Sequence, residues 1–260
     1  VDPPEAPSAP PPRGRRQRPG KAGSAAAAWL DPRFHTAFPR KMNKLLLHPA
    51  AKPLLWLLCL VPLAGWIWGG FHDSLGANPA ETILRGTGSW TLRFLCIVLV
   101  VTPLRPWTGL NALARWRRLL GLYVFFYSVL HFLAYAWLDM GFDPAAVVKD
   151  LARRPFALVG FLAFVLLVPL AATSFNRAIK AMGAARWQRL HRLVYAIALL
   201  GLLHFFWMRA SKHRYDEVLV YAVVIGGLLG VRLWRRLQAA PSPRAAPVAR
   251  NAQPSRVTGS

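Results

Sequence analysis

The chain has 260 residues, of which 55% are hydrophobic and only 17% are charged, and its formal net charge is +23. A soluble domain carries roughly a quarter charged residues, so this composition, together with long apolar runs, predicts an integral membrane protein. The positive charge is spread between apolar runs and over two tails with no binding module around it, which excludes nucleic acid as a partner. The two cysteines, Cys59 and Cys96, both fall within apolar runs and form neither a disulfide framework nor a metal site.

Two basic tails flank the apolar part of the chain. Residues 1–44 are rich in Pro, Ala, Arg and Gly, a composition that cannot bury enough apolar surface to fold, so we expect them to be disordered. Residues 237–260 have the same character and carry the same expectation. Met42 stands directly before the apolar part and is an alternative start, which would make the preceding residues an over-extension of the coding sequence.

Six apolar segments lie between the tails, each close to the roughly 20 residues that a helix needs to cross the hydrocarbon layer. They cover residues 53–70, 89–105, 119–138, 156–173, 190–208 and 217–234. The predicted fold class is an all-α integral membrane protein, in which residues 45–236 form a six-helix transmembrane bundle.

The distribution of Lys and Arg predicts the orientation of this bundle. Of the 33 basic residues, 25 lie in the two terminal segments and in the loops on their side, against 7 in the alternate loops, with Arg93 inside a span. Because cytoplasmic segments carry the excess of basic residues, both termini are expected in the cytoplasm. The loops expected on the other side are short and cover 71–88, 139–155 and 209–216.

Three of the seven histidines, His131, His191 and His204, lie in or at the edge of the predicted spans. An ionisable group inside a membrane is costly and is therefore a functional candidate. The alternative is a neutral imidazole that hydrogen-bonds a neighbouring helix. His131 and His204 lie at depths that agree within roughly 3 Å when each residue adds 1.5 Å. Two facing imidazoles at one depth suit an iron porphyrin held from both sides.

A second candidate site lies nearer the cytoplasm. His191 is about 20 Å from His204 along the predicted fifth span, and the two side chains do not share one stripe of the helix. The third span has no second histidine, but Arg117 stands at the depth of His191. Its planar guanidinium would bind a heme propionate or a flavin phosphate. The alternative is that Arg117 is one more basic residue of the cytoplasmic side.

The third span also carries a polar stripe. Tyr123, Tyr127, His131, Tyr135 and Asp139 are each four residues apart, so they share roughly one face of the helix, and that face should point into the bundle. The hydroxyls of the tyrosines, Tyr135 among them, would orient imidazole N–H groups or reach heme propionates. The alternative is that they only order helix contacts.

Several short motifs carry a family resemblance. They are LGANP, TPLR, RRLLGL, the LH of the third span and WQRLHRLVY, within residues 75–105, 117–139, 154–161 and 173–207. In these motifs the chain resembles the ferric reductase-like transmembrane domain. More closely, it resembles the MsrQ-type heme-binding membrane subunit of the bacterial periplasmic methionine sulfoxide reductase system. The resemblance covers about residues 45–236 and leaves the tails outside.

This resemblance implies a b-type heme and allows FMN as a further cofactor. It implies that His131, His191 and His204 are the heme-associated histidines. Proteins of the broader domain often carry two histidines on each of two helices, and this chain lacks the fourth, so the ligands of any inner heme stay open.

The function that the resemblance implies is electron transfer across the bacterial inner membrane. Electrons would pass from the quinone pool to a periplasmic molybdopterin-containing reductase of the MsrP type, which repairs oxidised methionine in proteins. The chain would then be the electron-transfer subunit of an oxidoreductase, with the substrate chemistry in its partner. It shows neither a GxGxxG motif after a strand nor a molybdenum site, so donor and final acceptor are other molecules.

Two other functions stay open. One is a stand-alone transmembrane reductase of ferric or other metal ions with the same fold. The other is a non-redox transporter or scaffold, in which the histidines only join helices.

Overall fold

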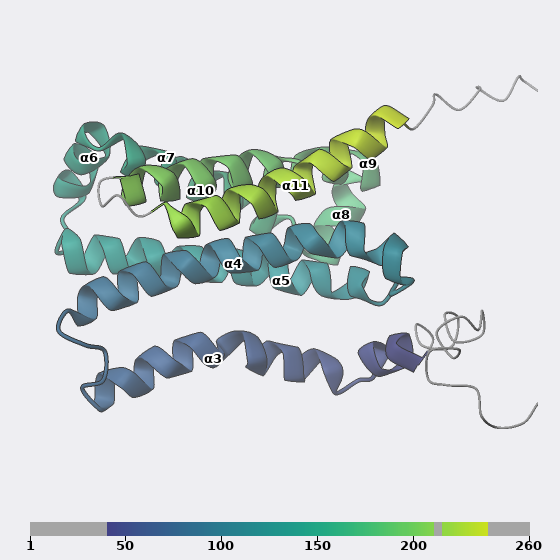
Figure 1. The fold of residues 1–260 in the computed structure, drawn as a ribbon, viewed down its shortest axis with the longest axis horizontal. Helices are drawn as coiled ribbons and strands as arrows, with labels where there is room; N and C mark the ends of the chain where they lie inside the picture. Colours follow the sequence, from purple (N-terminus) through teal and green to yellow (C-terminus); the bar gives the residue numbers. More distant parts are fainter. Residues whose placement is uncertain (1–40, 211–214, 239–260) are drawn as a thin grey trace, which may run out of the picture.

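The computed structural model describes residues 41–210 and 215–238, and Figure 1 shows their fold. Within these ranges the chain is helical, without a strand, and six helical segments are long and apolar enough to cross a membrane. The segments are α3 (Ala51–Phe71), α4 (Pro79–Thr108), α5 with the π-helix η1 (Leu113–Ala134 and Tyr135–Asp139), α7 (Pro155–Ala172), α9 with α10 (Ala184–His191 and Leu193–Ala210) and α11 (Asp216–Gln238). The predicted all-α bundle with six spans is confirmed.

The helices lie side by side along one long axis, so the bundle has two ends (Figure 1). The terminal end holds the start of α3, the end of α11 and the short helix α8 (Asn176–Met182). The α6 end lies opposite and holds α6 (Pro144–Arg153). The apolar core fills the space between α4, α5, α7, α10 and α11, with Leu99, Val124 and Ile197 almost completely buried.

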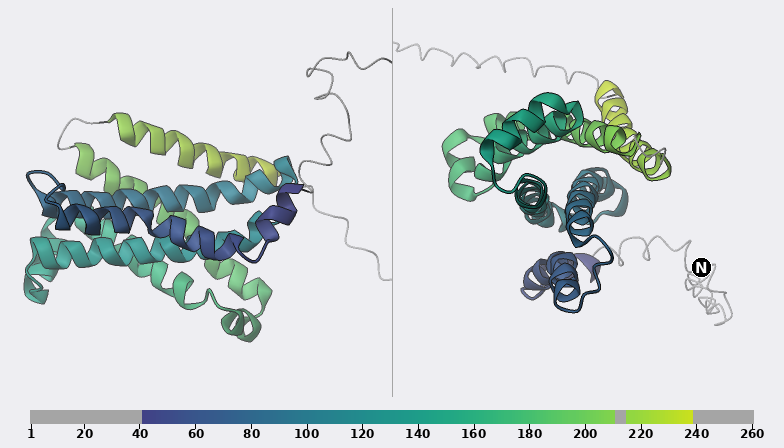
Figure 2. Two further views of the ribbon diagram at one scale, coloured as in Figure 1. Left: turned by 90° about the horizontal axis from the view of Figure 1, so that it is seen from below. Right: turned by 90° about the vertical axis from the view of Figure 1, so that its left-hand side faces the viewer.

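Helix α3 lies beside α4 and α5 at the edge of the bundle, as the two views of Figure 2 show. Two tyrosine hydroxyls of α5 donate to its backbone, Tyr123 to the Trp56 carbonyl and Tyr127 to the Cys59 carbonyl, both at 2.8 Å. Trp66 of α3 packs against α4 at Gly86, where an added Cβ would lie 2.5 Å from its ring. These contacts attach a helix whose outer face is otherwise exposed.

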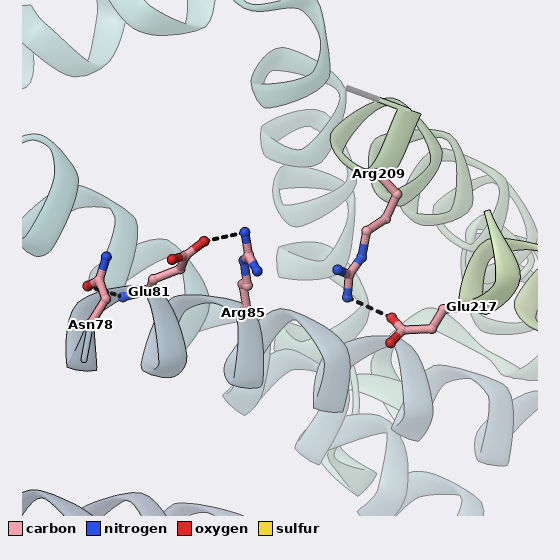
Figure 3. A network of polar contacts seen from close by, with 5 residues as sticks. All are labelled: Asn78, Glu81, Arg85, Arg209 and Glu217. Carbon is pink, nitrogen blue, oxygen red and sulfur yellow. Dashed lines mark hydrogen bonds and ion pairs between the residues drawn. The ribbon is translucent and has the colours of Figure 1, made fainter. Parts of the chain in front are cut away.

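Helix α4 begins at Pro79, well before the predicted span at 89–105, because its first turns are polar but well capped. The Asn78 side chain accepts from the Glu81 N–H at 3.1 Å, and Glu81 forms an ion pair with Arg85 (Figure 3). These interactions extend the helix beyond the apolar part of the sequence. Arg209 and Glu217 form a second pair at 2.6 Å, which joins α10 to α11 (Figure 3).

Three expected irregular segments are partly helical. The predicted loop 139–155 contains α6, an amphipathic helix capped by Asp143, so the expectation of a plain loop was wrong. Residues 41–47 form a helix although 1–44 was expected to be disordered, and Asn43 ties this helix to the α4–α5 connection by accepting from the Ala112 N–H at 3.0 Å. Helix α11 runs to Gln238, past the predicted boundary at 236. The remainder of both tails, 1–40 and 239–260, falls outside the described residues.

The fifth span is not one continuous helix. Helix α9 ends at His191, a turn follows at Arg192, and α10 starts at Leu193. His191 and His204 therefore belong to two helical pieces rather than to the single helix that the apolar pattern predicted.

Candidate functional site

His131 of α5 and His204 of α10 face each other across a cavity of about 190 Å³ enclosed by α4, α5, α7 and α10. The centroids of the two imidazole rings are 6.2 Å apart and their planes are inclined by 73°. The lining is mostly apolar, with Leu92, Val124 and Leu167 among its buried side chains. The structure thus brings together the two histidines that their equal depth had predicted to face each other.

The hydrogen bonds of His131 define which ring nitrogen carries the proton. Its Nδ1 lies 3.0 Å from the Leu84 carbonyl oxygen and 3.3 Å from the Thr87 hydroxyl. That hydroxyl donates to the Ile83 carbonyl at 2.8 Å, so it offers only lone pairs to the ring. Because Nδ1 is surrounded by acceptors, the network assigns the proton to it. Nε2 is left with a free lone pair.

His204 has the same arrangement on the opposite side. Its Nδ1 donates to the Phe156 carbonyl of α7 at 2.7 Å, which again leaves Nε2 as the unprotonated nitrogen. Metal-ligating histidines in proteins typically donate their other ring N–H to a carbonyl or carboxylate, which fixes ring orientation and raises ligand basicity. Both imidazoles are therefore arranged as metal ligands.

The separation of the rings fits one metal ion held between two imidazole nitrogens. Two metal–nitrogen bonds of about 2.0 Å each, with the distances from nitrogen to ring centre, add to about 6 Å. A bare metal ion would require further protein ligands, and no group of three or more His, Cys, Asp or Glu side chains in the described ranges could supply them. A metal in a porphyrin brings four ligands of its own and needs only two axial nitrogens, so this donor set suits a heme.

A polar cluster borders the cavity toward α6. The Tyr135 hydroxyl donates to Asp150 Oδ2 at 2.7 Å, and Arg154 Nε lies 3.0 Å from Asp150 Oδ1. Tyr135 also lines the cavity, and because its hydroxyl is bonded to a carboxylate, its role as a cofactor contact stays a prediction. The expectation that tyrosines orient the imidazole N–H groups was wrong, because backbone carbonyls do so. Tyr123 and Tyr127 instead order a helix contact, which was the alternative interpretation, since both hydroxyls bond to the backbone of α3.

A second cavity, of about 230 Å³, lies toward the terminal end. Arg117 and His191 both line it, so the structure brings together the two residues predicted to share a depth. Arg105 and Arg118 line it as well, and no acidic residue does. A phosphate or carboxylate group would meet three guanidinium groups there.

His191 differs from the other two histidines in its hydrogen bond. Its Nε2 lies 3.2 Å from the Thr173 hydroxyl, which donates to the Pro169 carbonyl at 2.7 Å and therefore accepts from the imidazole. The Trp187 ring stacks on the imidazole with 4.0 Å between centroids, and its Nε1 donates to the Thr173 carbonyl. His191 thus presents Nδ1, rather than Nε2, as its unprotonated nitrogen.

Several residues of these sites were not predicted. Gly88 of α4 and Gly160 of α7 lie against the rings of His131 and His204, Arg105 lines the second cavity, and Thr173 bonds the His191 ring. Gly160 lies inside a predicted span, whereas Gly88 falls at the end of the predicted loop 71–88, and only the pairing of helices shows which glycine meets a histidine.

Comparison with known proteins places the fold in a family. Residues 87–202 match the ferric reductase like transmembrane component. The chain is 62% identical over 208 residues to the protein-methionine-sulfoxide reductase heme-binding subunit MsrQ of Polaromonas naphthalenivorans, covering 80% of this chain and 91% of the relative. It is 54% identical over 185 residues to the MsrQ of Ralstonia nicotianae, covering 71% and 85%. The chain belongs to the MsrQ family. The MsrQ of Bordetella pertussis is 50% identical over 192 residues, covering 73% of this chain and 93% of that protein. The resemblance inferred from short motifs is confirmed, and this MsrQ protein is a multi-pass membrane protein.

Proposed function

We propose that this MsrQ protein is a membrane cytochrome that binds heme between His131 and His204 and serves as the electron-transfer subunit of a methionine sulfoxide reductase. The observation that carries the proposal is the pair of facing imidazoles, with ring centroids 6.2 Å apart, whose Nδ1 atoms are bonded to backbone carbonyls. The names of the relatives, which call them heme-binding subunits, support it.

Each residue of the site has a definite part in this function. His131 and His204 would supply the two axial nitrogens, and the Leu84 and Phe156 carbonyls keep both rings in the binding tautomer. Neither cysteine lines the cavity, which supports a non-covalently held heme of the b type. A bound heme supplies a one-electron carrier, and the apolar walls keep water away from it.

The second cavity supports a further cofactor with an anionic group. Arg117 would bind that group, a flavin phosphate of FMN or a heme propionate, together with Arg105 and Arg118. His191 would contact the same cofactor through its free Nδ1. Because its Nε2 is bonded to Thr173 and no second histidine lines the cavity, the arrangement favours FMN over a second bis-histidine heme.

The two cavities lie one behind the other between the ends of the bundle, which suits electron transfer across a membrane. Electrons from the quinone pool would enter at the second cavity. They would leave from the heme at the α6 end, toward a periplasmic molybdopterin-containing reductase of the MsrP type. This direction requires a position in the bacterial inner membrane with both termini in the cytoplasm, and the excess of basic residues on that side supports such an orientation.

An absorption spectrum of the purified protein tests this function. We expect the Soret band and the reduced α band of a low-spin heme. His131→Ala and His204→Ala should each lose heme or convert it to a high-spin form, because each removes one axial nitrogen. His72→Ala is the matched control, because His72 is exposed and bonds only to its own helix. A protein without a Soret band would favour a non-redox transporter or scaffold instead.

A further inference from the structure

Each of the two facing histidines lies in a notch of a neighbouring helix, formed by a glycine and the carbonyl four residues before it. In α4 the notch consists of Gly88 and the Leu84 carbonyl, and it holds the ring of His131. In α7 it consists of Gly160 and the Phe156 carbonyl, and it holds the ring of His204. The bonded carbonyl and histidine are 47 residues apart in the first case and 48 in the second. The same device therefore occurs twice at nearly the same spacing.

Helix geometry explains why a glycine is needed at these positions. In an α-helix the carbonyl of one residue accepts from the N–H four residues later, so Leu84 and Phe156 accept from the N–H groups of the two glycines. A carbonyl oxygen has a second lone pair, and the imidazole N–H uses it. A side chain at the glycine position would stand between the ring and that lone pair. Only a residue without Cβ lets the ring approach the helix backbone so closely.

The distances show how little space the notches leave. A Cβ added at Gly88 would lie 2.9 Å from Cε1 and 3.2 Å from Nδ1 of His131. A Cβ added at Gly160 would lie 2.7 Å from Nδ1 and 2.8 Å from Cε1 of His204. Both rings are held in the bundle interior between helices, so they cannot move aside without changing their hydrogen bond.

We propose that Gly88 and Gly160 are positioning residues that set the orientation of the two axial imidazoles and, through it, the ligand field of the heme. This inference rests on the proposed heme site. Alanine at either position should push the ring away from the helix, lengthen the Nδ1–H···O=C bond and tilt Nε2. The effect should be larger at Gly160, where the added carbon would lie closest to the hydrogen-bonding nitrogen itself.

Gly88→Ala and Gly160→Ala test the inference, with heme content, electron paramagnetic resonance and midpoint potential as readouts. Loss of a hydrogen-bonded partner of a metal ligand typically costs about tenfold to hundredfold in affinity, and we expect heme binding to weaken within this range. Heme that remains should show altered low-spin g values, or a high-spin signal, and a shifted potential. Alanine is a better helix former than glycine, so helix stability does not explain such changes.

Two glycines of the same bundle provide matched controls. Gly226 lies in α11, lines neither cavity, and an added Cβ there would meet no atom within 4 Å. Gly65 lies in α3, also lines neither cavity, and its Cβ would likewise meet no atom within 4 Å. Gly226→Ala and Gly65→Ala should keep the wild-type heme content, g values and potential.

The outcomes separate this inference from the proposed function. If the wild-type protein binds no heme, the proposed function fails. If the wild type binds low-spin heme and both Gly88→Ala and Gly160→Ala match Gly226→Ala in g values and potential, the positioning role is wrong. If Gly160→Ala does not accumulate in the membrane, the milder Gly88→Ala decides the matter by the same readouts.

Discussion

The three histidines of the spans use their ring nitrogens in two different ways. His131 and His204 donate from Nδ1 to backbone carbonyls, whereas His191 donates from Nε2 to the Thr173 hydroxyl. The partner of one nitrogen decides which nitrogen is left to bind a ligand. The first two therefore form a matched pair for one metal, and His191 stands apart beside a cavity lined by arginines.

At the second cavity we predict that Arg117→Leu lowers the content of any phosphate-bearing cofactor. The substitution removes one of three guanidinium groups from a cavity without acidic residues. A hydrogen bond to a charged group contributes about 1.5–3 kcal/mol, so binding should weaken by about tenfold or more. FMN released from the denatured protein can be measured by fluorescence.

Arg115→Leu is the control for this prediction, because Arg115 is exposed on the same helix and does not line the cavity. His191→Ala should lower the cofactor content as well. If Arg117→Leu and His191→Ala both keep the wild-type cofactor content and rate of electron transfer, Arg117 is simply one more basic residue of the cytoplasmic side.

The sequence was sufficient to predict the residues that face the cavities but not the groups that hold them. His131 and His204 could be paired because depth in a membrane follows from counting residues along a helix. Their partners are backbone carbonyls, which every residue has, so residue type does not reveal that Leu84 and Phe156 are the acceptors. The assignment of the tyrosines failed for a related reason, since the acceptors of Tyr123 and Tyr127 are carbonyls of α3.

At the scale of elements, α3 is the spanning helix with the fewest contacts to the rest of the bundle, and its link through Tyr127 can be tested. Tyr127 is completely buried and donates to the Cys59 carbonyl. Tyr127→Phe should cost about 1 kcal/mol, which raises the population of detached α3 about fivefold. The Cys59 thiol is 3% exposed and reports this detachment by its reaction with a maleimide.

The measurement uses a Cys96→Ala background, in which Cys59 is the only cysteine of the chain. Tyr221→Phe serves as the control, because Tyr221 lies in α11 and packs against Phe205, away from α3. Equal labelling rates in the two variants would mean that the hydroxyl contributes nothing to the docking of α3.

Apolar length predicted the existence of every spanning helix but not its ends. α4 starts at Pro79 because the cap of Asn78 and the pair of Glu81 with Arg85 stabilise turns that are too polar to appear in a hydropathy pattern. The turn at Arg192 was not predicted because it lies within a continuous basic and apolar run. Helix α6 was not predicted because it is a short amphipathic helix within an expected loop.

For the whole molecule, the distribution of charge gives the two ends different characters. The acidic residues of the described part lie in elements that reach the α6 end, namely the α3–α4 connection, the start of α4, η1, α6 with its N-cap and the start of α11, whereas arginines dominate the terminal end. Since cytoplasmic segments are rich in Lys and Arg, we predict the terminal end in the cytoplasm. A reporter active only in the cytoplasm should work when fused after Gln238 and fail when inserted at Gly141, before α6. The reverse pattern would invert the topology.

The same asymmetry predicts which end delivers electrons. The candidate heme cavity borders α6, whose exposed Lys149 and Arg153 lie next to the polar cluster of Asp150. Charges at a transient interface change the encounter rate more than the affinity. We therefore predict that Lys149→Glu with Arg153→Glu slows oxidation of the pre-reduced protein by the proposed periplasmic reductase and alters the salt dependence of that rate. The decay of the reduced α band measures it.

Charge reversal at the opposite end is the matched control for this last prediction. Arg186→Glu with Arg189→Glu changes two exposed arginines of α9 at the terminal end, and it should leave the rate of oxidation by the reductase unchanged. Free ferric chelates provide the second comparison, because a small oxidant needs no docking surface on α6. If the chelates oxidise the heme quickly while the reductase does not oxidise it in any variant, a stand-alone metal reductase explains the protein better. If the reductase is slowed only by the α9 variant, electrons leave from the terminal end.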